Sequence, residues 1–256
     1  MSFLFAVSGK GGVGKTTVSA LIVRRLIARG RTPVLAVDAD PNTCLDLALG
    51  VRAEDTIGAI REETKKLAAA GETKGISKQE LLELKIAQAL VEAEKFDYIA
   101  MGRPEGPGCY CYANNVLRSV LSRLADHYPA VVLDNEAGLE NLSRRIVRGV
   151  DALVLVTDGS RAGRETVLRL HALAGEMEIA YRRLALVVNR VRGEAPAFDP
   201  GELQRATGAE TVVVLPDDPE IARRAEEGLT LLEDMDDNPV IQRVGDLADR
   251  IAGEEK

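Results

Sequence analysis

The stretch Ser8-Gly9-Lys10-Gly11-Gly12-Val13-Gly14-Lys15-Thr16-Thr17 decides the fold of this chain. It fits the spacing G-x-x-x-x-G-K-[ST] and directly follows the apolar run 3–7, which predicts a buried strand. A glycine-rich turn between a strand and a helix aims backbone N–H groups, and the positive end of the helix dipole, at a polyphosphate. We therefore expect a phosphate-binding loop in which Lys15 contacts the outer phosphates and the Thr16 hydroxyl ligates Mg²⁺. The residues expected to line the nucleotide are Gly9, Gly11, Gly12, Val13, Gly14, Lys15, Thr16 and Thr17.

A second lysine, Lys10, follows the first glycine of the loop, where the general spacing does not require one. The loop thus resembles the deviant phosphate-binding loop K-G-G-x-G-K-T-T of the family that contains MinD, ParA, the nitrogenase iron protein and the arsenite-pump ATPases. The resemblance implies that Lys10 crosses a dimer interface to the partner's nucleotide, where a cation delivered in trans neutralises transition-state charge. Two alternatives stay open: Lys10 as a solvated loop lysine, and the whole stretch as a glycine-rich turn without a ligand.

The composition of the chain limits its class. Its 256 residues are enough for one α/β domain with a large core. The excess of 40 Asp and Glu over 33 Lys and Arg gives a net charge of −7, which disfavours a nucleic-acid surface. No apolar run approaches the ~20 residues that span a bilayer, and no charged leader precedes the first strand. We expect a cytoplasmic protein that binds neither nucleic acid nor a membrane.

Two carboxylates follow the second predicted strand, which covers residues 33–37. In open α/β sheets, ligands bind at the carboxyl ends of the strands. The segment Asp38-Ala39-Asp40-Pro41-Asn42 resembles the D-x-D-P-x switch I of the same ATPase family, which implies that Asp40 orients and activates the attacking water and that Asp38 supports the Mg²⁺ shell. The alternative, a pair of capping residues before a helix over 43–49, is compatible with catalysis. Cys44 lies among leucines and is expected to be a core thiol.

The rest of the chain predicts alternating strands and helices. Residues 51–94 are an exception, for which we expect a helical insertion packed on the nucleotide core, with helices over 56–70 and 78–94. The fold class is therefore α/β, a single doubly wound, mostly parallel sheet of P-loop NTPase type over 1–256 with helices on both faces. Strands are expected over 96–101, 130–134, 151–156, 184–188 and 211–215, and helices over 18–29, 114–125, 161–177 and 239–252.

Three further positions complete the expected site for ATP or ADP. Asp134 ends a strand of Walker B type and is placed to hold Mg²⁺ through water, and an expected switch II follows it over 135–138. Asn189 ends a later strand at a place that resembles the adenine-reading position of these ATPases, where an amide can pair with both a donor and an acceptor of the base. Pro216 begins a turn that could wall the base.

The segment 103–112 contains Cys109 and Cys111 in a C-x-C arrangement. Glycines and prolines force a turn there, and the N-terminus of the helix that follows favours thiolates over thiols. Thiolates bind soft or borderline metals, and because a tetrahedral site needs four ligands, a two-fold dimer would supply the other two. A pair of buried small side chains and a redox pair are the alternatives.

The sequence G-P-G-C-Y-C, together with the deviant phosphate loop and the later segment D-N-E-A-G, resembles the CooC family of nickel-insertion ATPases. These serve carbon monoxide dehydrogenase, and a close sub-branch serves acetyl-CoA synthase. The resemblance covers nearly the whole chain and implies a homodimer in which Cys109 and Cys111 of both subunits bind one Ni²⁺ or Zn²⁺. It also implies slow ATP hydrolysis that releases nickel to one of these client enzymes. An iron–sulfur reductase and a positioning ATPase of MinD or ParA type are the alternatives.

Overall fold

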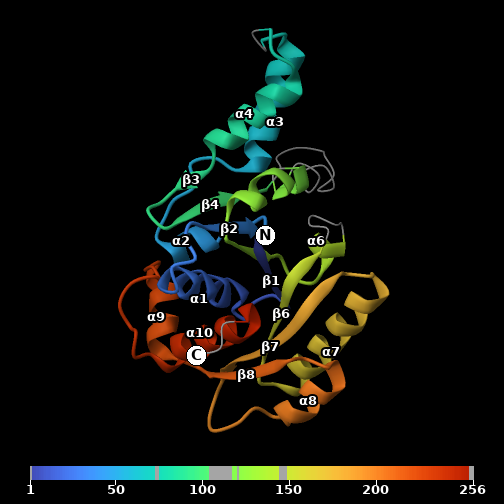
Figure 1. Ribbon diagram of the computed structural model, residues 1–256, viewed down its shortest axis with the longest axis vertical. Coiled ribbons are helices and arrows are strands. Elements are labelled where there is room, and N and C mark those ends of the chain that lie inside the picture. Colours follow the sequence, from blue (N-terminus) through green and yellow to red (C-terminus); the bar gives the residue numbers. More distant parts are fainter. Residues whose placement is uncertain (1, 73–74, 104–116, 120, 144–148, 254–256) are drawn as a thin grey trace.

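The computed structural model describes residues 2–72, 75–103, 117–119, 121–143 and 149–253 (Figure 1). In this part of the chain eight strands form one sheet, in the order β3-β4-β2-β5-β1-β6-β7-β8. Neighbouring strands run parallel except β3 and β4, which confirms the prediction of a single, mostly parallel sheet. The strands are β1 (Phe3–Gly9), β2 (Val34–Ala39), β3 (Val91–Glu92), β4 (Phe96–Ala100), β5 (Ala130–Asn135), β6 (Val150–Asp158), β7 (Tyr181–Val191) and β8 (Thr211–Pro216).

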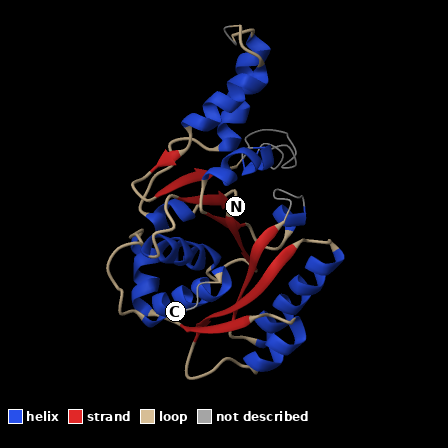
Figure 2. Cartoon of the chain, viewed as in Figure 1, coloured by secondary structure: helices blue, strands red, loops and turns tan. Residues whose placement is uncertain are grey.

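Helices cover both faces of the sheet, as predicted (Figure 2). Apolar residues of α1, α2, α9 and α10 pack on one face, and those of α3, α4, α6, α7 and α8 pack on the other. Among the described residues no helix combines the length and the apolar character that crossing a membrane requires. The helices are α1 (Lys15–Ala28), α2 (Leu45–Leu49), α3 (Ile57–Ala70), α4 (Lys78–Gln88), α6 (Glu140–Ser143), α7 (Arg161–Glu176), α8 (Pro200–Thr207), α9 (Pro219–Glu227) and α10 (Pro239–Ala252), with further helical residues at 117–119 and 121–124 and a 3-10 turn, η1 (Ala125–His127).

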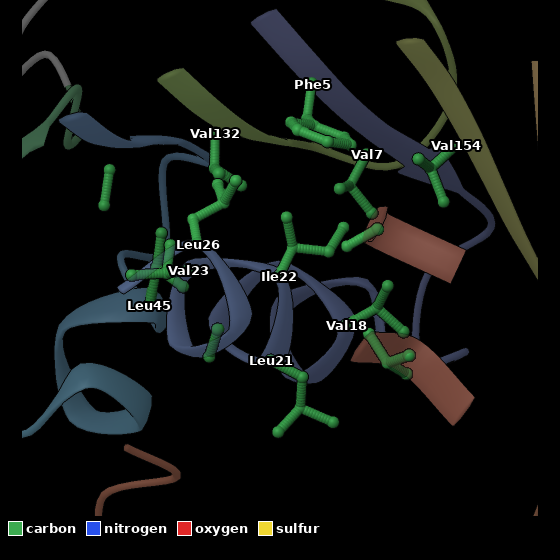
Figure 3. Packing of buried hydrophobic residues seen from close by; sticks show 14 of the residues in the cluster. Phe5, Val7, Val18, Leu21, Ile22, Val23, Leu26, Leu45, Val132 and Val154 are labelled. Atoms are coloured by element: carbon green, nitrogen blue, oxygen red, sulfur yellow. The ribbon is translucent and has the colours of Figure 1, made fainter. Parts of the chain in front are cut away.

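The packing of α1 fixes the helix that begins at the predicted phosphate loop. Val18, Ile22 and Leu26 recur at helical spacing and are 0–3% exposed, facing Phe5 and other side chains of the central strands (Figure 3). Burying one such side chain contributes roughly 1.5–3 kcal/mol, so the helix is held against β1 by its own apolar stripe. The phosphate loop is therefore anchored at one end by β1 and at the other by α1.

Ion pairs tie α10 to α1 on the same face. Asp249, 6% exposed, accepts hydrogen bonds from the guanidinium groups of Arg25 and Arg29, with 3.0 Å between Arg25 Nε and Asp249 Oδ1. Burial alone raises the pKa of Asp249, but the hydrogen bonds from Arg25 and Arg29 reverse that effect and lower the pKa to about 2. The C-terminal helix is thus clamped to the helix of the phosphate loop.

The insertion forms a hairpin of α3 and α4 that extends beyond the sheet (Figure 1). Its root packs on the core through Ile57, Ile60 and Ile86, in partial agreement with the predicted packing. The predicted helix over 78–94 is wrong in its last part, because α4 ends at Gln88 and residues 91–92 form β3, antiparallel to β4. The Ala93 N–H donates to the Phe96 carbonyl at 2.9 Å and closes a tight turn, which gives Val91 a strand partner that outweighs its helical spacing.

Strand order places the phosphate loop at the point where the chain changes direction in the sheet. β1 lies between β5 and β6. The chain leaves β1 toward β2 in one half of the sheet, and after β5 it crosses to β6 in the other half. Ligands of open α/β sheets bind at such a switch point, outside the carboxyl ends of the strands. The ends of β1, β2 and β5 therefore bring the glycine loop, the Asp38 segment and Asp134 to one edge, as the sequence predicts.

Candidate functional site

The phosphate loop spans the end of β1 at Gly9 and the start of α1 at Lys15. Gly14, the residue before the helix, has a φ of 93°, and a Cβ there would lie 2.3 Å from Asn189 Nδ2, so the position requires glycine. Lys15 is 8% exposed and its Nζ donates to the Lys10 carbonyl at 3.3 Å. The ammonium group is thus folded back over the loop, where it can meet an anion.

Asp134 stands behind the loop, fully buried at the end of β5. It accepts hydrogen bonds from Thr16 Oγ1 at 2.7 Å and from Ser19 Oγ at 3.0 Å. Burial, and then the nearby negative charge of Asp38, raise the pKa of Asp134 to about 7, although the two hydroxyl donors oppose the rise. The two hydroxyl donors therefore do not offset the cost of burying the negative charge of Asp134, and a cation beside this carboxylate would stabilise it.

Asp38, also fully buried, is the direct neighbour of Asp134 in the register of β2 and β5. Its carboxylate accepts the backbone N–H groups of Asp40, Cys44 and Leu45 at 2.9–3.0 Å. Burial raises the pKa of Asp38 to about 6 despite these donors. The capping alternative is thus realised for Asp38, which fixes the start of α2 and shapes the segment that carries Asp40.

The donor set at this edge fits Mg²⁺. Asp38 and Asp134 lie side by side on the neighbouring strands β2 and β5, and both are shielded from water. A divalent cation would relieve the repulsion between the two carboxylates, and Thr16 adds a hydroxyl oxygen. Hard oxygen ligands of this kind are those that Mg²⁺ prefers. When bound, the cation would supply charge neutralisation for phosphate oxygens at the mouth of the loop.

Asp40 and Lys10 lie at the rim of the site. Asp40 is half-buried and accepts the Asn42 N–H at 2.9 Å, so its segment forms a tight turn with the carboxylate at the surface of the site. Lys10 is exposed. Both charged groups are therefore accessible to a ligand or to a second subunit without a change in the fold.

The expected switch II contacts the phosphate loop, and the adjacent helix α6 contacts the end of β2. The Gly138 N–H donates to the Gly9 carbonyl at 3.0 Å, and Asn141 Nδ2 donates to the Ala39 carbonyl at 3.0 Å. Asn141 is buried, and within the part of the chain that the structure describes its Oδ1 has no hydrogen-bond partner. These two hydrogen bonds therefore connect the region at the start of α6 directly to the phosphate loop and to the segment that carries Asp40.

A cavity of about 420 Å³ opens on the other side of the phosphate loop. Asn189 and Pro216, the two residues expected to contact the base, both line it. Asn189 is 7% exposed and its Nδ2 donates to the Val13 carbonyl at 2.9 Å, so this amide also supports the loop. The volume suits a nucleoside. Arg190 lines it too, and the other lining residues include Thr17, Leu21, Asp217 and Ile221.

Cys109 and Cys111, with the rest of the segment 104–112, lie outside the described residues, and so does Asn114 at the start of the predicted helix. Within the described ranges no group of three or more His, Cys, Asp or Glu side chains is placed to hold a metal ion. Cys44 is exposed, so its prediction as a core thiol is wrong. Its backbone N–H donates to Asp38, and its thiol lies 3.8 Å from the Asn42 carbonyl oxygen.

The sequence prediction missed three side chains of this site. Ser19 lies three residues after Thr16 on the same helix face, and this spacing could have marked it as a second donor to Asp134. Asn141 carries no sequence signal for its contact with Ala39. Arg190 donates from its Nη1 to the Gly12 carbonyl at 2.9 Å and likewise carries no sequence signal for that contact.

Comparison with known proteins gives three relevant likenesses. The model of the family described as CobQ/CobB/MinD/ParA nucleotide binding domain matches residues 4–231. An uncharacterised ATP-binding protein of Methanocaldococcus jannaschii is 41% identical over 249 residues, which cover 97% of this chain and 98% of the relative. The carbon monoxide dehydrogenase accessory protein CooC of Rhodospirillum rubrum is 32% identical over 185 residues, 68% of this chain and 70% of that protein.

Solved structures show the same fold. The septum site-determining protein MinD of Pyrococcus horikoshii, solved with Mg-ADP, aligns with a TM-score of 0.69 and 23% identity, covering 98% of this chain and 96% of that one.

Proposed function

The chain belongs to the CobQ/CobB/MinD/ParA family of nucleotide-binding domains, and we propose that this ATP-binding protein is an ATP-driven metallochaperone. In this proposal two copies form a dimer that carries one nickel ion as cargo, with zinc as a possible substitute. ATP hydrolysis then releases the nickel to carbon monoxide dehydrogenase or acetyl-CoA synthase.

The arrangement of the loop residues supports ATP hydrolysis. Lys15, folded back over the loop, and the backbone N–H groups of the loop would hold the β- and γ-phosphates, and Thr16, Asp134 and Asp38 would supply oxygen atoms to Mg²⁺. Asp40, at the rim, orients a water molecule toward the γ-phosphorus. The new P–O bond forms as the water gives a proton to Asp40 and the bond between the γ-phosphorus and the β–γ bridging oxygen breaks, so that ADP leaves with that oxygen. Lys10 of the second subunit neutralises the charge that builds up there.

The observation that carries the nickel cargo is the pair Cys109 and Cys111 in a chain 32% identical to a CooC protein. Two thiolates from each of two subunits complete a four-sulfur site, which nickel and zinc both accept. The contacts of Gly138 and Asn141 with the nucleotide loops support a mechanical link between hydrolysis and the dimer.

Anaerobic nickel binding tests this proposal. The chain is incubated with Ni²⁺ and either ADP or a non-hydrolysable ATP analogue, passed through size exclusion and analysed for metal. We expect about one nickel per dimer, lost in Cys109→Ser/Cys111→Ser and retained in Cys44→Ser, the matched control at the remaining cysteine. Retention of nickel in the double variant would refute a C-x-C site.

A positioning ATPase is the second candidate, favoured by the structural likeness to MinD. The apolar face of α10 is buried against the core and clamped to α1, so this helix is not available to lie on a membrane. Absence of nickel in every nucleotide state, together with intact ATP hydrolysis, would favour this candidate over the metallochaperone.

A further inference from the structure

β7 is irregular where it meets the phosphate loop. Its register with β8 shifts between Val188 and Val191, and Arg190 within this shift has a φ of 54°. Successive side chains of a regular strand point to opposite faces. At this bulge Asn189 and Arg190 instead both reach the same loop, which is a known effect of β-bulges on side-chain direction.

The two side chains hold two consecutive carbonyl groups. Asn189 Nδ2 donates to the Val13 carbonyl and Arg190 Nη1 to the Gly12 carbonyl, each at 2.9 Å. The C=O and N–H of a trans peptide point in opposite directions. Fixing these carbonyls therefore directs the N–H groups of Val13 and Gly14 away from β7, into the loop.

We propose that Arg190 is a positioning residue for the polyphosphate: by holding the Gly12 carbonyl outward it keeps the Val13 N–H aimed at the phosphate groups. Without this donor, the peptide between Gly12 and Val13 can rotate and turn its carbonyl oxygen toward an anion, which repels it. The inference rests on ATP binding within the proposed function and does not depend on the nickel cargo.

The backbone at Arg190 supports a functional reason for this side chain. A left-handed conformation is unfavourable for a residue with a Cβ, and glycine or asparagine adopts it more readily. Retaining arginine at φ 54° is therefore consistent with a side chain that the site needs. Asn189 makes the neighbouring contact with the same loop, and its Nδ2 lies so close to Gly14 that no larger residue fits there.

Affinities for ADP, ATP and adenosine test the proposal, measured by competition with a fluorescent ADP analogue in Arg190→Met, Arg190→Lys and Arg190→Asn. Arg190 also lines the cavity expected to take the base, so adenosine is the reference for any effect there. We expect Arg190→Met and Arg190→Asn to weaken ADP and ATP about tenfold more than they weaken adenosine, since only the phosphates meet the loop N–H groups. Arg190→Lys, which keeps a donor and a charge, should retain affinity within about threefold. Arg190→Asn removes the contact while accepting the backbone conformation, so it separates the contact from strain.

Arg182→Met is the matched control, because Arg182 lies at the other end of β7 and its side chain is paired with Asp151 at 3.1 Å. Its affinities should equal those of the unaltered chain. Unchanged ADP affinity in Arg190→Met, or an equal loss for adenosine and ADP, would overturn the positioning role. ADP binding by the unaltered chain is the separate test of the proposed function, so the two failures are distinguishable.

Discussion

Asp38 and Asp134 are the residues at which the site departs most from an ordinary protein interior. Both carboxylates are fully buried, and each has a raised pKa because burial disfavours its charged form. A folded-state pKa above the unfolded value means that folding favours the protonated form. The stability contribution is therefore complete below about pH 4 and is lost as the pH rises through about 7 for Asp134. The site is strained at neutral pH without a cation.

Replacing Asp134 by Asn removes that strain. We expect Asp134→Asn to stabilise the nucleotide-free chain at pH 8 by about 1 kcal/mol or more, which is roughly 2–4 °C in Tm, and to have little effect below about pH 4. The additional stabilisation that Mg²⁺ gives in the presence of ATP should disappear. Thermal denaturation with and without Mg²⁺ and ATP measures both, with Asp126→Asn, an exposed carboxylate, as the control. A lower Tm at pH 8 without ligands would contradict the account.

These residues were predictable because their signals are local. The glycine spacing, the position of Asp38 and Asp134 after apolar strands, and the hydroxyl of Thr16 are all read from short segments. Arg190 was not predictable as a loop contact, because its direction depends on a bulge and a positive φ that no residue type in Val188–Val191 requires. The contact of Asn141 was not predictable either, because its partner is a backbone carbonyl, which no residue type marks in the sequence.

At the level of elements, the clamp between α1 and α10 holds the base of the phosphate loop. Asp249 accepts from Arg25 and Arg29, and its pKa of about 2 lies below the usual value of 3.8. For a lowered carboxylate pKa the stabilisation is present above the unfolded value and is lost as the pH falls toward 2. Periodicity predicted α10, whereas this ion pair joins residues more than 200 positions apart and left no local signal.

Asp249→Asn should destabilise the chain by about 2 kcal/mol at pH 7, because the pKa difference of nearly two units is lost. The difference from the unaltered chain should shrink as the pH is lowered from about 4 toward 2.5. Urea denaturation across this range measures it, with Asp246→Asn on the exposed side of the same helix as the control. An equal loss at pH 7 and pH 2.5 would show that packing, not charge, is responsible.

The prediction of elements failed where a short strand competed with a helix. Residues 91–92 carry helical spacing, yet the turn at Ala93 and Phe96 lets them pair with β4 at the sheet edge. The apolar run 184–188 has no such competitor and was correctly predicted as a strand. The strand that it belongs to, β7, extends beyond the predicted range at both ends.

For the whole molecule, the sequence predicts a doubly wound sheet, but strand order and the projecting hairpin of α3 and α4 depend on contacts between distant segments (Figure 1). The family and the fold follow from the comparisons. The cargo follows from Cys109 and Cys111, which lie outside the described residues, and it stays a proposal. In the proposed function, the nucleotide state controls how tightly a dimer holds nickel.

The measurement that tests this claim most directly is the affinity for Ni²⁺ by chelator competition, in the presence of Mg²⁺ with ADP and with a non-hydrolysable ATP analogue. The account predicts at least about tenfold tighter binding with the ATP analogue, because hydrolysis is proposed to release the metal, and this corresponds to about 1.4 kcal/mol of coupling. Equal affinities in the two states would contradict it, since ATP hydrolysis then could not drive release.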